Sequence, residues 1–212
     1  MLSPETRLMR LDHIFLRFDD LVKHAGALKI ETVGGVYLVA ANVAGVTNHE
    51  HASVLSRLGL QFVAAVREME AAFRAEVEGF SDSALRLVVR VGVNSGPVIG
   101  GVIGKLLPRY RIFGDTVNTA ARMETNSEPG RVQLSASSAE LLRKNLPPGV
   151  TLVPRGEIEV KGKVRRVLFG VRQFLWDRAD FKGQKGRVRA RRLVCSEGTG
   201  GLLRCACVTP YS

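Results

Sequence analysis

Two apolar runs separated by only two glycines set the strongest limit on how this 212-residue chain can fold. Residues 28–33 and 36–43 have the apolar, β-branched character of strands, and Gly34-Gly35 suits a two-residue turn that requires positive φ. Strands joined by so short a turn pair antiparallel. We therefore expect a sheet that contains hairpins.

Stretches with helical spacing of apolar residues surround this hairpin and recur further along the chain. The first ends near Gly26, a suitable helix terminator, and Asp115 and Ser135 are candidate N-caps for two later helices. The predicted helices are 4–24, 49–78, 115–126 and 135–145, and the further predicted strands are 85–93, 98–103, 110–113, 131–134, 152–160 and 164–171. This pattern predicts one mixed α/β (α+β) domain over residues 1–175, with helices packed on a mixed sheet.

The tail, residues 176–212, differs in composition from the rest. It holds eight Lys and Arg against three Asp and Glu, about half of the net charge of +11, and its periodicity is lost in a basic, glycine-punctuated run. We expect this tail to lack regular structure and assign it no function. The body is only mildly basic and aromatic residues make up 6% of the chain, so no specific nucleic-acid partner is expected.

The sequence gives no sign of secretion or of membrane insertion. No apolar run reaches the ~18–20 residues of a membrane helix, and the charged N-terminal residues do not form a signal peptide. The three cysteines all lie in the tail and do not match a zinc-site spacing. We expect an intracellular, cytoplasmic protein, attached to a membrane only through segments outside this chain.

Three segments carry a resemblance to a known family. They are RVGVNSGPVIGGVIGKLLPRYRIFGDTVNTAARMETNSEPGRVQLS (90–135), FDDLVKHAGALKIETVGGVYLVAANV (18–43) and PRGEIEVKGKVRRVLFGV (154–171). They occur in family order and resemble the catalytic domain of the class III adenylate and guanylate cyclases over residues 8–175.

The resemblance implies a specific reaction. The 3′-hydroxyl of GTP or ATP attacks its own α-phosphate, pyrophosphate leaves, and a 3′,5′-cyclic nucleotide forms, so catalysis consists of positioning and of neutralising phosphate charge. Family members hold two Mg²⁺ or Mn²⁺ ions on two aspartates, and the active site forms between two domains of a dimer. One domain supplies the aspartates and the other supplies an Asn, an Arg and a Lys.

The resemblance places this second set of residues on Asn118, Arg122 and Lys161. Asn118 would orient the ribose, Arg122 would stabilise the phosphates in the transition state, and Lys161 would contact the triphosphate, with Lys163 as the weaker candidate for that role. Asn118 and Arg122 are four residues apart and share a face of one predicted helix. A guanidinium suits phosphate because it stays charged and presents a fork of donors.

Two positions bear on purine choice. Glu31 matches the acidic residue of guanylate cyclases, and a carboxylate can accept hydrogen bonds from guanine N1 and N2. Arg111 matches neither the Cys of guanylate cyclases nor the Asp of adenylate cyclases. It could donate to guanine O6 and N7, or it could pair with Glu31 and fill an empty purine pocket. We favour GTP over ATP as the nucleotide.

The metal-binding carboxylates are not recognisable in this chain. Gly35 stands where the family hairpin carries its second metal aspartate, and the strand that carries the first aspartate, before the opening helix, is missing. Asp12, Asp19 and Asp20 lie in the predicted opening helix, where they are poor substitutes, and the last two match a motif that packs structurally. We expect an exposed sheet edge, to be covered by an upstream segment or by a partner.

Three interpretations follow. The chain could be the transition-state half of a dimer whose partner supplies the metal ligands. It could be a degenerate cyclase-like module that binds nucleotide or dimerises without turnover. It could also be a fragment of an ordinary cyclase, but Gly35 opposes this, because truncation does not explain a substitution.

The purified chain is expected to turn over neither GTP nor ATP, because metal ions bridge the phosphates and activate the attacking oxygen. Cyclic nucleotide production with Mg²⁺ or Mn²⁺, measured by chromatography, checks this. Robust turnover by the chain alone would contradict it.

Overall fold

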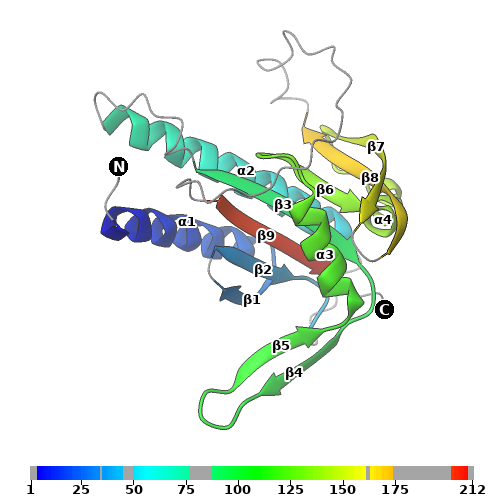
Figure 1. Ribbon diagram of the computed structural model, residues 1–212, viewed down its shortest axis with the longest axis horizontal. Helices are drawn as coiled ribbons and strands as arrows, with labels where there is room; N and C mark the ends of the chain where they lie inside the picture. The colour runs from blue at the N-terminus through cyan, green and yellow to red at the C-terminus, as the bar shows by residue number, and fades with distance from the viewer. Residues whose placement is uncertain are drawn as a thin grey trace.

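The computed structural model describes residues 4–33, 35–44, 50–76, 87–160, 163–173 and 202–209 (Figure 1). The helices are α1 (Pro4–His24), α2 (His51–Glu76), α3 (Asp115–Thr125) and α4 (Ala136–Lys144). The strands are β1 (Leu28–Val33), β2 (Val36–Ala40), β3 (Val88–Ser95), β4 (Ile99–Ile103), β5 (Arg109–Phe113), β6 (Val132–Ser135), β7 (Val150–Val160), β8 (Lys163–Gln173) and β9 (Leu202–Thr209).

The main sheet is mixed, as the sequence predicts, with strand order β1-β2-β9-β3-β6-β8-β7. The pairs β1–β2, β6–β8 and β7–β8 are antiparallel, whereas β9 is parallel to both of its neighbours and β3 is parallel to β6. Strands β4 and β5 form a separate antiparallel ribbon that projects from the body (Figure 1).

Each face of the sheet has its own core. Alternate strand residues point to opposite faces, so Tyr37 and Val39 pack with α1, α2 and α4, whereas Leu38 and Ala40 pack with α3 and with Ile112 of β5. On the first face, the rings of Phe18, Tyr37 and Phe62 lie within 6 Å of one another. Helix α3 is therefore alone among the four described helices in covering the second face.

The local predictions are mostly confirmed. Val33 pairs with Val36, which gives the two-residue hairpin turn, and α1 ends at His24, two residues before Gly26, whose φ is +64°. Ser135 caps α4, and its hydroxyl accepts from the Ser138 amide. The prediction that Asp115 caps α3 is wrong: Gly114 is the N-cap residue, with no side-chain cap, and Asp115 is the first residue of the helix.

The largest difference from the sequence prediction concerns the tail. Residues 202–209 form β9, which lies in the sheet between β2 and β3, so the expectation of no regular structure is wrong for these eight positions. The same strand occupies the interior position where a missing strand was expected to leave an open edge. The sequence did not reveal it because its partners lie more than 100 residues earlier in the chain.

The β4–β5 ribbon exposes an unusual amount of apolar surface. Its apolar side chains with at least half of their surface exposed are Ile99, Val102, Ile103, Leu106, Leu107 and Phe113. Clusters of this kind on a projecting element are typical of interaction surfaces. None of the described helices has the length and apolar character to cross a membrane.

Helix α3 approaches the backbone of β3 closely because residue 92 is glycine. A Cβ placed on Gly92 would lie 2.5 Å from the Ala120 carbonyl oxygen and 2.7 Å from the Glu124 Cα. Both contacts are backbone atoms of α3, which cannot move aside without displacing the helix. The absence of a side chain at residue 92 therefore allows the short distance between α3 and β3.

Gly92→Ala is expected to lower the free energy of unfolding by roughly 1–3 kcal/mol, because the added methyl overpacks this contact. Chemical denaturation followed by circular dichroism measures the change. Gly101→Ala is the matched control, since a Cβ there meets nothing within 4 Å. Equal effects of the two substitutions would contradict the packing argument.

Candidate active site

Helix α3 carries Asn118 and Arg122 side by side, one turn apart. The opposite side of the helix is buried against the sheet by Thr116, Thr119, Ala120 and Met123. Asn118 is exposed and Arg122 is half-buried. The structure thus confirms the helix and the shared face that the spacing predicts, while their catalytic role stays a prediction.

The N-terminal end of α3 is held to the end of β3. The buried side-chain amide of Asn94 donates to the Thr116 carbonyl oxygen at 3.0 Å. The Thr116 hydroxyl donates to the Pro97 carbonyl oxygen at 2.6 Å. These bonds tie the first turn of the helix to the segment that leads into the β4–β5 ribbon.

Hydrogen bonds also fix the C-terminal end of α3, around Arg122. The Arg122 carbonyl oxygen accepts from both the backbone amide and the side-chain amide of Asn126, at 3.1 and 2.7 Å. The buried Gln133 donates to the Met123 carbonyl oxygen at 3.2 Å. Arg155 of β7 bonds to Gln133 and to the Asn126 carbonyl oxygen. The backbone that carries Arg122 is thereby fixed from two strands.

Arg122 has unused hydrogen-bonding capacity. Its Nη1 is buried, and nothing in the part of the chain that the structure describes accepts a hydrogen bond from it. A buried donor without an acceptor costs about 1–3 kcal/mol, and more when it is charged. An anionic ligand would remove this cost, and a phosphate oxygen has the charge and geometry that a guanidinium prefers.

Glu31 of β1 meets Arg111, the middle residue of β5 in the ribbon. The β1–β2 register shifts between Lys29 and Glu31, and this bulge places Glu31 opposite Leu38, on the sheet face that α3 and β5 cover. The Arg111 guanidinium forms an ion pair with the Glu31 carboxylate, and both side chains are about one-quarter to one-third exposed. The sequence left two arrangements open for Arg111, and the structure shows the one in which it pairs with Glu31.

The residues near the hairpin do not fit a divalent metal ion. Gly35 offers no side chain, and Asp19 is engaged by the Tyr37 hydroxyl and by Lys29, whose Nζ lies 2.7 Å from Asp19 Oδ1. Asp12 and Asp20 are exposed on α1. Within the described residues, no three His, Cys, Asp or Glu side chains cluster as metal ligands would. This donor set does not suit Mg²⁺ or Mn²⁺.

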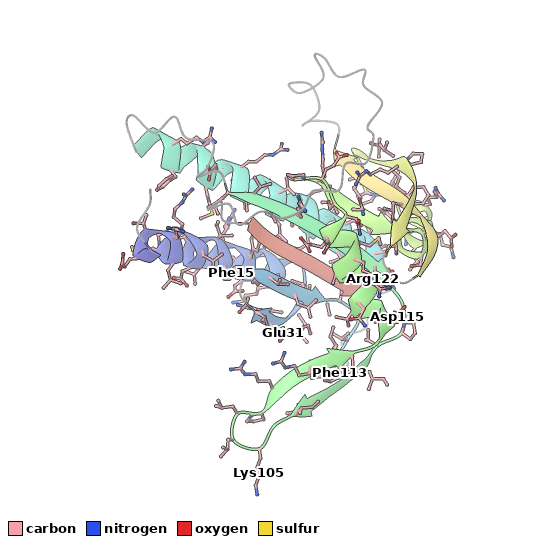
Figure 2. All side chains as sticks on the ribbon, in the orientation of Figure 1. Phe15, Glu31, Lys105, Phe113, Asp115 and Arg122 are labelled. Carbon is pink, nitrogen blue, oxygen red and sulfur yellow. The ribbon has the colours of Figure 1, made fainter. Side chains whose placement is uncertain are left out.

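Lys161 lies outside the described residues, so the structure does not test its predicted place in the site. Lys163 begins β8, and only its backbone is described. Figure 2 labels two of the other candidates: Glu31 lies near the ribbon, and Arg122 lies on α3.

Comparison with known proteins decides the family. Residues 1–173 match the family model described as the adenylate and guanylate cyclase catalytic domain. The chain belongs to this family. This chain is 35% identical to receptor-type guanylate cyclase gcy-19 of Caenorhabditis briggsae over 161 residues, which are 75% of this chain and 12% of that protein. It is also 35% identical to human retinal guanylyl cyclase 2 over 153 residues, 72% of this chain and 13% of the relative.

A solved structure agrees with this assignment. The guanylate cyclase domain of RhGC from Catenaria anguillulae, in complex with GTP, superposes with a TM-score of 0.62 and 26% identity, covering 81% of this chain and 86% of that chain. The mixed sheet with packed helices is therefore the fold of a cyclase catalytic domain. The chain spans only about one-eighth of the length of the curated relatives it matches.

Sequence reasoning missed the residues that fix α3 in place. Asn94, Gln133 and Arg155 act on backbone carbonyls that are 10 to 29 residues away. The one available signal was a polar side chain inside an apolar strand, as at Asn94 and Gln133. Buried polar side chains of this kind need hydrogen-bond partners.

Proposed function

We propose that this cyclase supplies the ribose- and phosphate-handling half of a nucleotide cyclase site, and that its substrate is GTP, with ATP less favoured. The supporting observation is the buried Nη1 of Arg122, which lacks an acceptor among the described residues, on a helix whose two ends are fixed. In a complete site, a partner domain would supply the carboxylates for Mg²⁺ or Mn²⁺.

The proposed chemistry is a cyclisation in which the 3′-oxygen of the nucleotide bonds to the α-phosphorus and the bond to pyrophosphate breaks. Asn118 would hold the ribose, and Arg122 would stabilise the negative charge that develops on the phosphate oxygens. Lys161 would contact the triphosphate, from which pyrophosphate leaves. Positioning of this kind accounts for most catalysis of phosphoryl transfer, and it requires the fixed backbone that Asn126 and Arg155 provide.

A dimer is part of this proposal, and the β4–β5 ribbon is its proposed contact surface. The exposed apolar side chains of the ribbon would be covered by the partner. A second copy of this chain would again bring Gly35 to the hairpin, so a homodimer adds no carboxylate at that position. A heterodimer with a cyclase domain that carries both aspartates is the active form we propose.

The proposed location is the cytoplasm or the cytoplasmic face of a membrane. Both curated relatives above are far longer than this chain, and one is named a receptor-type guanylate cyclase. A membrane attachment would come from segments outside this chain.

Mixing the cyclase with a partner domain that has both metal aspartates but lacks the Asn and Arg is expected to restore cyclic GTP formation. Arg122→Ala should reduce the restored rate by about 100-fold or more, as expected for loss of one transition-state donor. The rate of product formation at saturating GTP measures the loss.

Arg57→Ala is the matched control, because Arg57 is an exposed arginine on α2. Its restored rate should equal that of the unchanged chain. Arg122→Lys should recover little, because an ammonium lacks the planar fork. An inert mixture, or equal rates for the Arg122 and Arg57 variants, would reject the proposal.

The Glu31–Arg111 ion pair favours a second candidate, a module that dimerises or regulates without turnover. As described, the pair engages the two side chains that would otherwise face a purine. A nucleotide must then break the pair before Glu31 can accept from guanine. This function predicts weak GTP binding by the unaltered chain.

Arg111→Ala discriminates between the two candidates by calorimetry with GTP in metal-free buffer. If the pair blocks the purine subsite, the substitution frees Glu31 and should tighten GTP binding by about tenfold. If Arg111 donates to guanine, the same substitution should weaken binding by a similar factor. Arg109→Ala, an exposed arginine two residues earlier on β5, should leave the affinity unchanged.

A further inference from the structure

The centre of the sheet depends on a strand from the far end of the sequence. β9 pairs with β2 over residues 204–208 and with β3 over residues 202–209. Adjacent strands lie about 4.8 Å apart, so β2 and β3, with one strand between them, stand roughly 10 Å apart and cannot bond to each other. Without β9, both would present unpaired N–H and C=O groups to the gap.

Unpaired backbone groups on two interior strands are costly. Each buried N–H or C=O group without a partner destabilises the fold by about the free energy of one hydrogen bond. The gap also lies between two cores, since Val89, Val91 and Val93 of β3 are buried on one face and α3 covers the other. A segment with an extended backbone in the gap would pair with these groups on both strands.

We propose that the gap between β2 and β3 is a strand-binding site and that residues 202–209 are its tethered occupant, bound in cis. The segment LLRCACVT suits this site, because it has one charged residue, no proline and no glycine. The stretch 174–201 connects β8 to β9 in the same chain. A tether raises the effective concentration of the strand at its site to about millimolar.

The direction of β9 determines which other strand could occupy the gap. Helix α1 enters β1 through a short turn, so a strand that led into α1 through a similarly short loop would run parallel to β1. It would then be antiparallel to β2, whereas β9 is parallel to β2. Such a strand and β9 would need the same gap in opposite directions, so they exclude each other.

This inference does not depend on the proposed nucleotide chemistry. It rests on the backbone pairing of three strands, and its measurements use no nucleotide. Failure of the complementation experiment with a partner cyclase domain would leave it untouched.

Amide hydrogen exchange of the full chain tests the proposal. The same change, alanine to proline, is made once inside β9 and once before it. Ala206 pairs with Leu38 on one side and with Gly92 on the other. Ala206→Pro removes an N–H from the ladder and should make the amides of 36–40 and 88–95 exchange at least about 100-fold faster. Ala190→Pro, in the stretch that precedes β9, is the matched control and should leave this exchange unchanged.

A peptide with the sequence of residues 202–209 provides a second measurement, under reducing conditions. Added to the Ala206→Pro chain, it should restore slow exchange of β2 and β3, whether that variant is locally open or largely unfolded. The same peptide with proline at the position of Ala206 should not. Equal exchange in the two proline variants, or failure of the peptide to restore protection, would overturn the proposal.

The concentration dependence separates binding in cis from exchange of β9 between two copies. Protection of 36–40 and 88–95 should be independent of protein concentration if each chain fills its own gap. Protection that falls on dilution would show that a second copy donates the strand, and would overturn binding in cis.

Discussion

The contact between α3 and the backbone of β3 is the constraint on which the candidate site depends. Gly92 lets the helix lie where any side chain would hold it away. The hydrogen bonds of Asn94 and Gln133 then fix the helix along its length. Catalysis by positioning requires functional groups on rigid elements. Arg122 meets this condition because its own carbonyl oxygen is capped by Asn126.

The two proposed purine contacts, Glu31 and Arg111, lie on elements other than α3. Glu31 lies on β1, at the edge of the sheet (Figure 2), and Arg111 lies on β5 of the projecting ribbon. Their ion pair joins two elements without involving α3. An exchange of this pair for contacts with a base would therefore leave Arg122 in place.

Local patterns could be read from the sequence, and long-range ones could not. The β1–β2 hairpin follows from two adjacent residues, and the Ser135 cap follows from a hydroxyl before an apolar helix. Asp115 failed as a cap because Gly114, with φ of +137°, takes that position. Strand β9 was missed because a mostly apolar run of eight residues in a basic tail does not identify partners so far away. The Glu31–Arg111 pair could be stated only as one of two alternatives, since spacing carries no information about side-chain contacts across elements.

The charge around α3 has a consequence for what the site can bind alone. Gly35 contributes no carboxylate at the hairpin, and the segment that fills the neighbouring gap, residues 202–209, contains no Asp or Glu. Carboxylates that would hold cations would also repel a triphosphate in their absence. Gly35 and residues 202–209 contribute no such carboxylate, so neither would oppose the proposed contact between Arg122 and phosphate. Under the proposed function, a hairpin turn and a β9 strand without carboxylates would favour binding of the metal-free nucleotide.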